Sequence, residues 1–503
     1  MSLFGSVKPA EPIIPFLPVG GLFDIPTAAH VVGIHGQMVM SGGFGPITGV
    51  VGKPHMFKST ILKSLLYRAM LRIFSTMNTS ALMYDTEITV VEAHQRDMIA
   101  YMSSHFDDLR NQYYSDTGTL VRDMFDPENQ CLVFTNRNKY NGDEYYELLK
   151  TILRAKNPEN KQKKGDEKID AFKWIDSPFF DRDGKSPLKV LLPTLGDVDS
   201  LSEFRTASDD EVQEHELGSK DALTGFMKEG LNKTRFVMGL PQLTTQNFHY
   251  MGLTGQIGKE IAMSSGPMPS APQKQLSAMK SGDVLKGVSG KFISLSNVCW
   301  QAIKTTPSLQ THRIEDGPKY PLNETSGNKY DNDVYEIDLA CLRNKNGPTG
   351  FTIQIVVSQS KGVLFDLTEF HFIKSHEYWG LEGNQQNYRC TFLPDVPLSR
   401  TTIRKKLDSE TKLQRAINIA SEMLQLKLFN PSWWGMYGCT PQELYQGLKD
   451  KGYDWDELLA TRGWYSFDAN HPIKELATLD LLRMNKEAYF PYWMDKETKR
   501  AKV

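Results

Sequence analysis

The residues Gly52-Lys53-Pro54-His55-Met56-Phe57-Lys58-Ser59-Thr60 have the types and spacing of a phosphate-binding loop. They match the pattern G-x-x-x-x-G-K-[ST] except at Phe57, where the motif has glycine. In that motif the backbone N–H groups surround a polyphosphate, the lysine reaches the β- and γ-phosphates, and the hydroxyl that follows ligates Mg²⁺. We therefore expect these nine residues to bind a nucleotide, with Lys58 on the phosphates and Ser59 on the metal. A side chain at Phe57 indicates that this backbone position does not need a positive φ.

The flanking residues predict the elements that such a loop requires. An apolar run, Ile47-Thr48-Gly49-Val50-Val51, precedes it and predicts a strand. Apolar residues at helical spacing follow it: Ile61, Leu62, Leu65, Leu66, Ala69, Met70, Ile73 and Phe74. A strand, a turn and a helix in this order aim N–H groups and the positive end of a helix dipole at one point.

Hydrolysis also needs a carboxylate that activates water, and Glu87 is the candidate. The run Ala81–Tyr84 predicts a strand that ends in Asp85-Thr86-Glu87. Open α/β sheets place their sites at the carboxyl ends of parallel strands. In an extended chain Asp85 and Glu87 point the same way. The alternative is a solvated strand end.

A second acid is expected to hold Mg²⁺. The apolar run Leu188–Leu192 leads toward Asp197 and Asp199, although Pro193 and Gly196 interrupt it. Either aspartate could serve, and the Asp-Ser-Leu sequence that begins at Asp199 favours that residue. A polar loop after a buried strand explains the same residues about equally well.

Two further segments carry polar groups suited to the γ-phosphate. Gln242 follows an apolar run, Arg235–Leu240, and as a strand-end residue it could sense the phosphate. Arg343 and Lys345 lie on the connection between two predicted strands, on the same side. Two cations there cannot easily reach a phosphate held by Lys58 of the same subunit, so we expect them to complete the site of the next subunit. A basic surface turn is the simpler alternative.

The segment 244–290, which is rich in Gly, Ser, Met and Lys, is too long for an idle connection. Lys259, Lys274, Lys280 and Lys286 could meet phosphates of a nucleic acid, and its apolar residues could wedge between bases. A solvated insertion has a similar composition.

Composition limits the class of protein. The chain has 503 residues, 40% hydrophobic content and a net charge of −2, which indicates a globular protein of two or three domains. Five isolated cysteines favour a reducing, cytoplasmic compartment. We find no apolar run that would span a membrane and no signal peptide.

Strand-like and helical runs alternate between about 36 and 375, at Ala81–Tyr84, Cys131–Thr135, Lys189–Pro193, Arg235–Leu240, Lys291–Trp300, Val334–Leu342 and Phe351–Val357. This predicts an α/β core with a mostly parallel twisted sheet. Residues 1–35 form a Pro- and Gly-rich arm that could dock on a neighbour, and 156–170 form a charged loop. Residues 376–503 predict a small, mainly helical domain with an aromatic core.

Together these motifs resemble the RecA-like ATPase core, and among its members the phage UvsX-type recombinases. The resemblance covers roughly residues 36–375. It rests on Gly52-x-x-x-x-Phe57-Lys58-Ser59, on Tyr84-Asp85-Thr86-Glu87 and on the lead-in Met40–Gly45. It implies that Glu87 activates water, that Arg343 and Lys345 act across a subunit interface, and that 244–290 contacts DNA. ATP and Mg²⁺ are the implied cofactors. Single-stranded DNA, duplex DNA and further copies of the chain, in a filament or ring, are the implied partners, in the cytoplasm of a bacterial host.

Two other hypotheses remain open. Leu240-Pro241-Gln242-Leu243 and Lys345-Asn346-Gly347-Pro348-Thr349-Gly350 resemble the sensor and finger hairpin of hexameric DnaB-type helicases. Alternatively, the core is a non-motor ATP-binding platform whose aromatic C-terminal part binds a protein. A motor hydrolyses ATP faster when DNA is added, whereas a platform does not.

Overall fold

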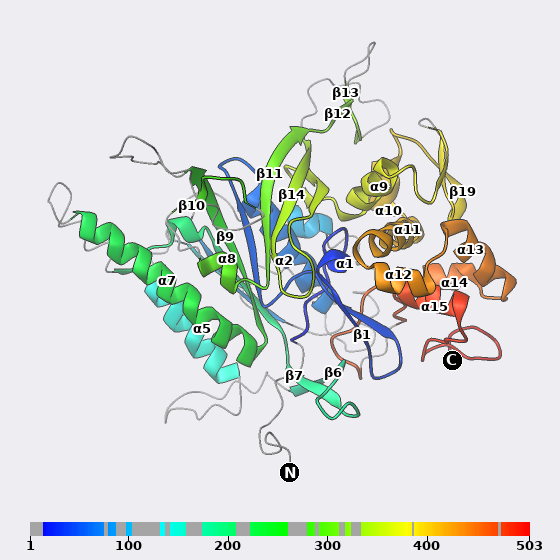
Figure 1. Ribbon diagram of the computed structural model, residues 1–503, viewed down its shortest axis with the longest axis horizontal. Coiled ribbons are helices and arrows are strands. Elements are labelled where there is room, and N and C mark those ends of the chain that lie inside the picture. Colours follow the sequence, from blue (N-terminus) through cyan, green and yellow to red (C-terminus); the bar gives the residue numbers. More distant parts are fainter. Residues whose placement is uncertain are drawn as a thin grey trace.

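The computed structural model describes residues 14–74, 79–86, 97–102, 131–135, 141–156, 174–207, 222–259, 279–286, 291–310, 317–322, 333–384, 387–470 and 474–502. One large sheet runs through the molecule (Figure 1). Its strands follow the order β16 (Gly362–Val363), β15 (Thr352–Ser358), β14 (Val334–Asn344), β11 (Val298–Pro307), β3 (Ile47–Gly52), β9 (His249–Lys259), β8 (Thr194–Asp199), β4 (Ser80–Asp85) and β5 (Cys131–Thr135).

The strands from β11 to β5 are parallel to one another, and those from β14 to β16 are antiparallel. The expected α/β class, with a mostly parallel twisted sheet and a helical C-terminal part, is confirmed. The expected strands at Ala81–Tyr84, Cys131–Thr135, Val334–Leu342 and Phe351–Val357 are confirmed to within about two residues.

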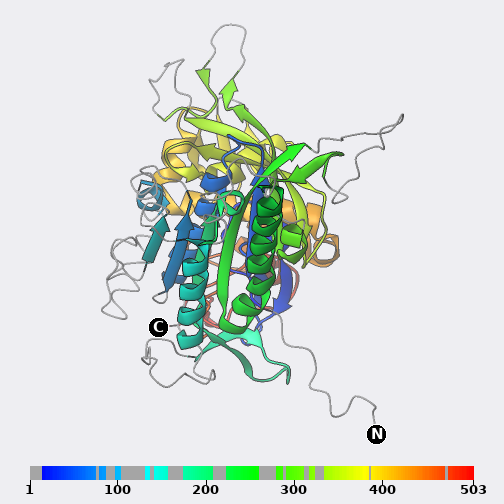
Figure 2. The same ribbon diagram turned by 90° about the vertical axis from the view of Figure 1, so that its left-hand side faces the viewer.

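Helices cover both faces of the sheet. On one face α5 (Gly142–Lys156) and α7 (Ala222–Asn247) lie side by side (Figure 2) and pack through Tyr145, Leu149, Phe236 and Leu240. On the other face lie α2 (Lys58–Phe74), α9 (Phe365–Ser375) and the C-terminal helices. These are α10 (Ile403–Ser409), α11 (Thr411–Phe429), α12 (Pro431–Tyr437), α13 (Pro441–Asp450), α14 (Trp455–Leu459) and α15 (Thr478–Lys486).

Three expected strands are wrong in whole or in part. Arg235–Leu240 lies inside α7, where Phe236, Val237 and Leu240 fall on one buried helical face. Lys189–Pro193 overlaps β7 (Pro187–Leu191), which among the described strands pairs with β6 (Trp174–Phe180) and not with the large sheet. The first half of Lys291–Trp300 is the short helix α8 (Lys291–Leu295).

The described part of the N-terminal arm, residues 14–35, packs on its own chain. Phe16, Leu17, Leu22 and Phe23 are each exposed by 3% or less. The short helix α1 (Asp24–Thr27) contacts α11, and the Tyr465 hydroxyl donates a hydrogen bond to the Phe16 carbonyl. Residues 14–27 are therefore part of the core of their own chain, and docking of the arm on a neighbour stays a prediction. One hydrophobic core joins the arm, the back of the sheet and the C-terminal helices.

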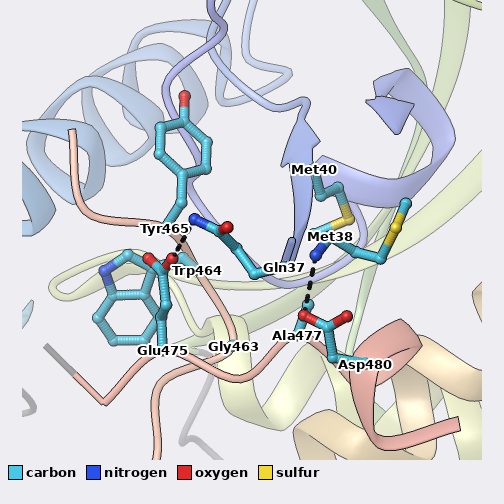
Figure 3. Close-up of a pocket in the computed structure, with 9 residues that line it drawn as sticks. All are labelled: Gln37, Met38, Met40, Gly463, Trp464, Tyr465, Glu475, Ala477 and Asp480. Carbon is cyan, nitrogen blue, oxygen red and sulfur yellow. Dashed lines mark hydrogen bonds between the residues drawn. The ribbon is translucent and has the colours of Figure 1, made fainter. Parts of the chain in front are cut away.

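Two buried carboxylates fasten the C-terminal segment to β2 (Met38–Ser41), which pairs with β1 (Ala29–Val32) (Figure 3). Glu475 accepts hydrogen bonds from the Gln37 side chain and the Ser466 N–H, each at 2.9 Å. Asp480 accepts one from the Met38 N–H, also at 2.9 Å. Burial raises the pKa of Glu475 to about 7 and that of Asp480 to about 6.

The raised pKa of Glu475 predicts a pH dependence of stability. Its folded pKa lies above the usual 4.5. The contribution of Glu475 to the free energy of unfolding is therefore fully present below about pH 4.5 and is lost as the pH rises through about 7. The full loss is on the order of 3 kcal/mol. We expect Glu475→Gln to remove this part of the slope in urea titrations between pH 4.5 and 7.5. The exposed Glu382→Gln is the matched control, and identical slopes for wild type and Glu475→Gln would contradict the assignment.

Candidate nucleotide-binding site

The predicted strand, loop and helix are present and in order. β3 is buried along its whole length, and α2 begins at Lys58, within the last three residues of the loop 52–60. Ile61, Leu62, Leu65, Leu66, Ala69, Met70 and Ile73 form its buried face, each exposed by 4% or less. α2 also lies close to β9, because a Cβ at Gly252 would lie 2.9 Å from Leu62 Cδ1. The N-terminal turn of α2 is thereby fixed at the carboxyl end of β3, where its N–H groups can face a phosphate.

The backbone at Phe57 differs from the sequence-based expectation. Its φ is +55°, and that of His55 is +59°, so both lie in the left-handed region. A non-glycine residue there costs roughly 1–2 kcal/mol. The Phe57 ring packs on Tyr335 of β14 at a centroid distance of 5.0 Å, which offsets part of that cost. The loop therefore keeps the conformation typical of the glycine and anchors it with an aromatic contact.

The side chains of Lys58 and Ser59 each form a hydrogen bond beside the loop. Lys58 Nζ donates to the carbonyl of Lys53, 3.1 Å away, so the side chain folds back over the loop. Ser59 Oγ donates to Oδ1 of Asp199 at 3.0 Å. A hydroxyl and a carboxylate from distant parts of the sequence thus meet beside the start of α2.

Asp199 is the last residue of β8, so the acid-bearing strand is Thr194–Asp199 and not the expected Lys189–Pro193. Its Oδ1 also accepts a hydrogen bond from Thr254 of β9 at 2.6 Å. Gly196, which interrupts the apolar pattern, lies inside the strand against the Leu82 carbonyl. Of the two candidate aspartates, only Asp199 contacts Ser59 among the described interactions.

Asp197 lies deeper, in a buried cluster around Lys63 of α2. Lys63 Nζ is 3.0 Å from Asp85, 3.3 Å from Asp197 and 3.9 Å from Asp199. Burial would lower the pKa of Lys63, but the carboxylates outweigh it and raise the pKa well above its usual range. Burial raises the pKa of Asp197 to about 6, and Lys63 acts against this shift. One lysine thus holds the carboxyl ends of β4 and β8 against α2. Sequence analysis missed it, because Lys63 lies in an otherwise ordinary helical pattern.

The Ser59 hydroxyl and the Asp199 carboxylate are suited to a Mg²⁺ ion that binds together with a nucleotide. Magnesium is typically bound by one or two carboxylates or hydroxyls together with substrate phosphates. Ser59 and Asp199 supply that set. Within the described ranges, no group of three or more His, Cys, Asp or Glu side chains is arranged to hold a metal ion by itself.

Gln242 does not lie where a γ-phosphate sensor is needed. It is exposed near the C-terminal end of α7, which leads back into the first residues of β9. The phosphate-binding loop lies at the other end of the sheet, after the carboxyl end of β3, which runs parallel to β9. The polar residue at that end is Gln256 of β9, which pairs with Gly52. The Gly-rich run around Gln256 looks like a loop in sequence, so no strand is expected there. Its position within the predicted DNA segment 244–290 is the signal that could have identified it.

Glu87 and Lys274 lie outside the described residues. The strand that leads to Glu87 is present, and Asp85 at its end is 2% exposed. Of the predicted DNA segment, 244–247 belong to α7 and 249–259 to β9, so the expected loop does not begin at 244. Lys259, Lys280 and Lys286 lie on or beside the antiparallel pair of β9 and β10 (Asp283–Leu285). Lys259 forms an ion pair with Asp283 at 2.6 Å.

Arg343 and Lys345 lie on the predicted hairpin. The hairpin is next to the amino end of β3, whereas the phosphate-binding loop follows the carboxyl end of that strand. Arg343 pairs with Cys299, which pairs with Gly49, three residues before Gly52. At about 3.3 Å per residue and 4.8 Å per strand, Arg343 lies roughly 14 Å from the end of β3. Neither cation reaches a phosphate at the loop of its own subunit.

Hydrogen bonds anchor the hairpin to the rest of the chain. Asn344 donates to the Pro26 carbonyl at 3.0 Å, and the Lys345 N–H donates to the Asn297 carbonyl at 3.0 Å. Lys345 is exposed, and its pKa is lowered by partial burial and by the nearby Arg343. Arg343 Nε is buried without a hydrogen-bond partner among the described residues.

No family model and no curated protein sequence matches this chain. Among solved structures, one described as an ATPase domain is similar over 63% of this chain and 82% of its own, with 11% identity and a TM-score of 0.29. These values are too low to carry an argument about activity, so the case for function rests on the site itself. None of the described helices combines the length and apolar content needed to span a bilayer.

Proposed function

We propose that the protein is an ATP-dependent DNA recombinase, which forms filaments on single-stranded DNA and promotes homologous pairing and strand exchange. The proposal that the protein binds ATP rests on one observation. The Ser59 hydroxyl donates a hydrogen bond to the Asp199 carboxylate at 3.0 Å, beside the first turn of α2. The recombinase part rests on the sequence resemblance to UvsX-type proteins.

In this proposal each site residue has a separate task. The loop 52–60 and Lys58 bind the phosphates of ATP, and Ser59 and Asp199 would hold Mg²⁺, which offsets phosphate charge when bound. Glu87 accepts a proton from the attacking water. Gln256 replaces Gln242 as the group that reports the γ-phosphate, because β9 continues from it to Lys259 and pairs there with β10, beside Lys280 and Lys286.

The distance between the hairpin and the loop of its own subunit supports a site shared between subunits. Arg343 and Lys345 would reach the γ-phosphate held by a neighbouring copy. Such a site makes hydrolysis depend on assembly, and it suits a filament as well as a ring.

The strand pair β9 and β10 supports the DNA part of the proposal. Lys280 and Lys286 are exposed next to β9, at the same edge of the sheet as the phosphate-binding loop. DNA bound there would contact the strand that carries Thr254 and Gln256, so DNA and ATP would influence each other through one element.

This surface predicts a salt-dependent interaction with single-stranded DNA. Replacing Lys274, Lys280 and Lys286 by Ala should weaken binding and reduce the slope of log K against log salt by about 2, at roughly 0.7 per lost phosphate contact. Fluorescence anisotropy with a labelled oligonucleotide measures both quantities.

The control for that experiment replaces three exposed lysines elsewhere, Lys405, Lys449 and Lys496, and so makes the same change in net charge. Equal affinity and an equal salt slope for both triple variants would remove residues 244–290 from the DNA surface.

A DnaB-type helicase is the alternative, and the hairpin sequence Lys345–Gly350 favours it. The other motif that resembles these helicases, Leu240-Pro241-Gln242-Leu243, lies inside the helix α7 and not at a strand end, so it does not support the helicase. Electron microscopy with an ATP analogue and single-stranded DNA separates the two: filaments support the recombinase, and closed rings support the helicase.

A further inference from the structure

A cluster of three cations lies around the ring of Tyr320, next to α9. Lys374 Nζ, on α9, is 5.5 Å from the centre of that ring, and Lys319 Nζ is 6.0 Å from it. Arg400 donates a hydrogen bond to the Pro318 carbonyl at 2.7 Å, which brings its guanidinium to the same place. All three cationic residues are partly exposed. The cluster therefore presents positive charge to the solvent.

The described carboxylates do not balance this charge. Glu336 is the one described acid that raises the pKa of Lys374, and it already pairs with Lys319 at 2.8 Å. The Lys374 ammonium has no ion pair or hydrogen bond with another described residue, and Arg400 has no ion pair with a described carboxylate. Burial, with Lys319 and Arg400 nearby, lowers the pKa of Lys374 to about 8. Two cations thus have no counter-ion of their own among the described residues.

An exposed aromatic ring lies beside these cations. Tyr378, which follows α9, is exposed by 37%. Its ring stacks on Tyr388 of β18 (Tyr388–Cys390) at a centroid distance of 5.9 Å and an interplanar angle of 25°. Lys374 Nζ lies 5.5 Å from the centre of the same Tyr388 ring. The exposed ring and the ammonium group are therefore supported by one side chain, so a single ligand can contact both.

The turn that carries Tyr378 has a constrained backbone. Glu377 and Tyr378 have φ angles of +54° and +56°, which are both in the left-handed region. The Leu381 N–H donates to the Tyr378 carbonyl at 2.7 Å, and the Trp379 N–H donates to the His376 carbonyl at 3.2 Å. Strained backbone of this kind is often found at binding sites. The Tyr378 ring is thus held in place before a ligand arrives, which lowers the entropic cost of binding.

This surface is separate from the strand pair β9 and β10. α9 packs on β15, and β15 is four strands away from β9 in the large sheet. At about 4.8 Å per strand, the two places are roughly 19 Å apart across the sheet. In Figure 1, β10 lies at the left, whereas α9 and β19 (Leu393–Leu398), which leads to Arg400, lie at the upper right.

We propose that Lys374, Arg400 and Tyr378 form a second surface for single-stranded nucleic acid. The two cations would contact backbone phosphates, and an unstacked base would lie on the exposed face of Tyr378. Cations together with an aromatic platform are typical of proteins that bind single strands with little sequence preference. The surface goes beyond the function proposed above, because it requires neither ATP nor the lysines near β10.

Fluorescence anisotropy with a labelled single-stranded oligonucleotide tests this surface. The parent protein for the test is full-length and carries Lys274→Ala, Lys280→Ala and Lys286→Ala, so the proposed contacts near β10 are absent. We expect it to keep saturable binding. Adding Lys374→Gln and Arg400→Gln should weaken that binding and reduce the slope of log K against log salt by about 1.4, at roughly 0.7 per lost phosphate contact.

The aromatic part of the surface is tested by two substitutions at one position. Tyr378→Ala in the same parent should weaken binding roughly fivefold or more, because a base loses the ring on which it stacks. Tyr378→Phe keeps a ring and should bind as the parent does.

Lys449→Gln with Lys496→Gln is the matched control for the two cations. Both lysines are exposed, and Lys449 Nζ also lies over a tyrosine ring, 4.9 Å from the centre of Tyr445. If the double variant at Lys374 and Arg400 does not fold by circular dichroism, Lys374→Gln alone decides, with about half the change in slope.

Three results would overturn the proposal. The first is the absence of saturable binding by the parent protein. The second is equal affinity and an equal salt slope for the folded cation variant and its control. The third is equal affinity for Tyr378→Ala and Tyr378→Phe.

Discussion

An Arg343→Ala, Lys345→Ala protein is expected to bind ATP as the wild type does and to hydrolyse it slower by a factor on the order of 10³ or more. The reason is geometric. Both residues lie at the sheet edge opposite the phosphate-binding loop, so they leave the ATP contacts of their own subunit intact. Their charge would act only on the transition state in a neighbouring subunit. A fluorescent ATP analogue measures binding, and phosphate release measures turnover.

Mixing this double variant with Glu87→Gln protein tests the shared site directly. Each variant has what the other lacks, so an interface that pairs an intact Glu87 with an intact neighbouring hairpin should regain activity. An Arg389→Ala, Lys405→Ala protein, which loses two exposed cations elsewhere, should keep full activity alone. If the mixed variants co-assemble and recover no hydrolysis, the hairpin does not act between subunits.

Lys58→Ala is expected to abolish ATP binding or turnover, because it removes the cation that faces the phosphates. Glu87→Gln should keep ATP binding and lose hydrolysis by roughly 10²–10⁴-fold, since an amide cannot accept the proton of the attacking water. The two variants therefore separate binding from chemistry, and the same binding and phosphate-release assays measure them.

The exposed Glu382→Gln makes the same chemical change away from the site and should hydrolyse ATP normally. Hydrolysis at the wild-type rate by Glu87→Gln would show that another group activates the water.

The elements with strong local patterns were predictable from sequence. The apolar run before Gly52 and the helical period from Ile61 to Ile73 each depend on neighbours within a few residues, and both elements form as expected. The hairpin that carries Arg343 and Lys345 was predictable for the same reason. Such signals identify an element without showing what surrounds it.

The remaining parts of the site depend on tertiary packing. The run Arg235–Leu240 has a composition that suits a strand, yet its apolar residues also form one helical face, and packing on α5 decides for the helix. The glycines in β9 and β8 weaken the strand pattern, but they allow close contact with Leu62 and the Leu82 carbonyl. Gln256 and Thr254 were missed for this reason. The contacts of Lys63 join residues far apart in the sequence, and no local pattern reveals them.

The rate of ATP hydrolysis with and without single-stranded DNA, measured over a range of protein concentrations, tests the central claim most directly. The account predicts slow hydrolysis by dilute protein alone, a rate per subunit that rises with protein concentration, and further stimulation by single-stranded DNA. A rate per subunit that is independent of concentration and unchanged by DNA would contradict it, and would favour a non-motor ATP-binding platform.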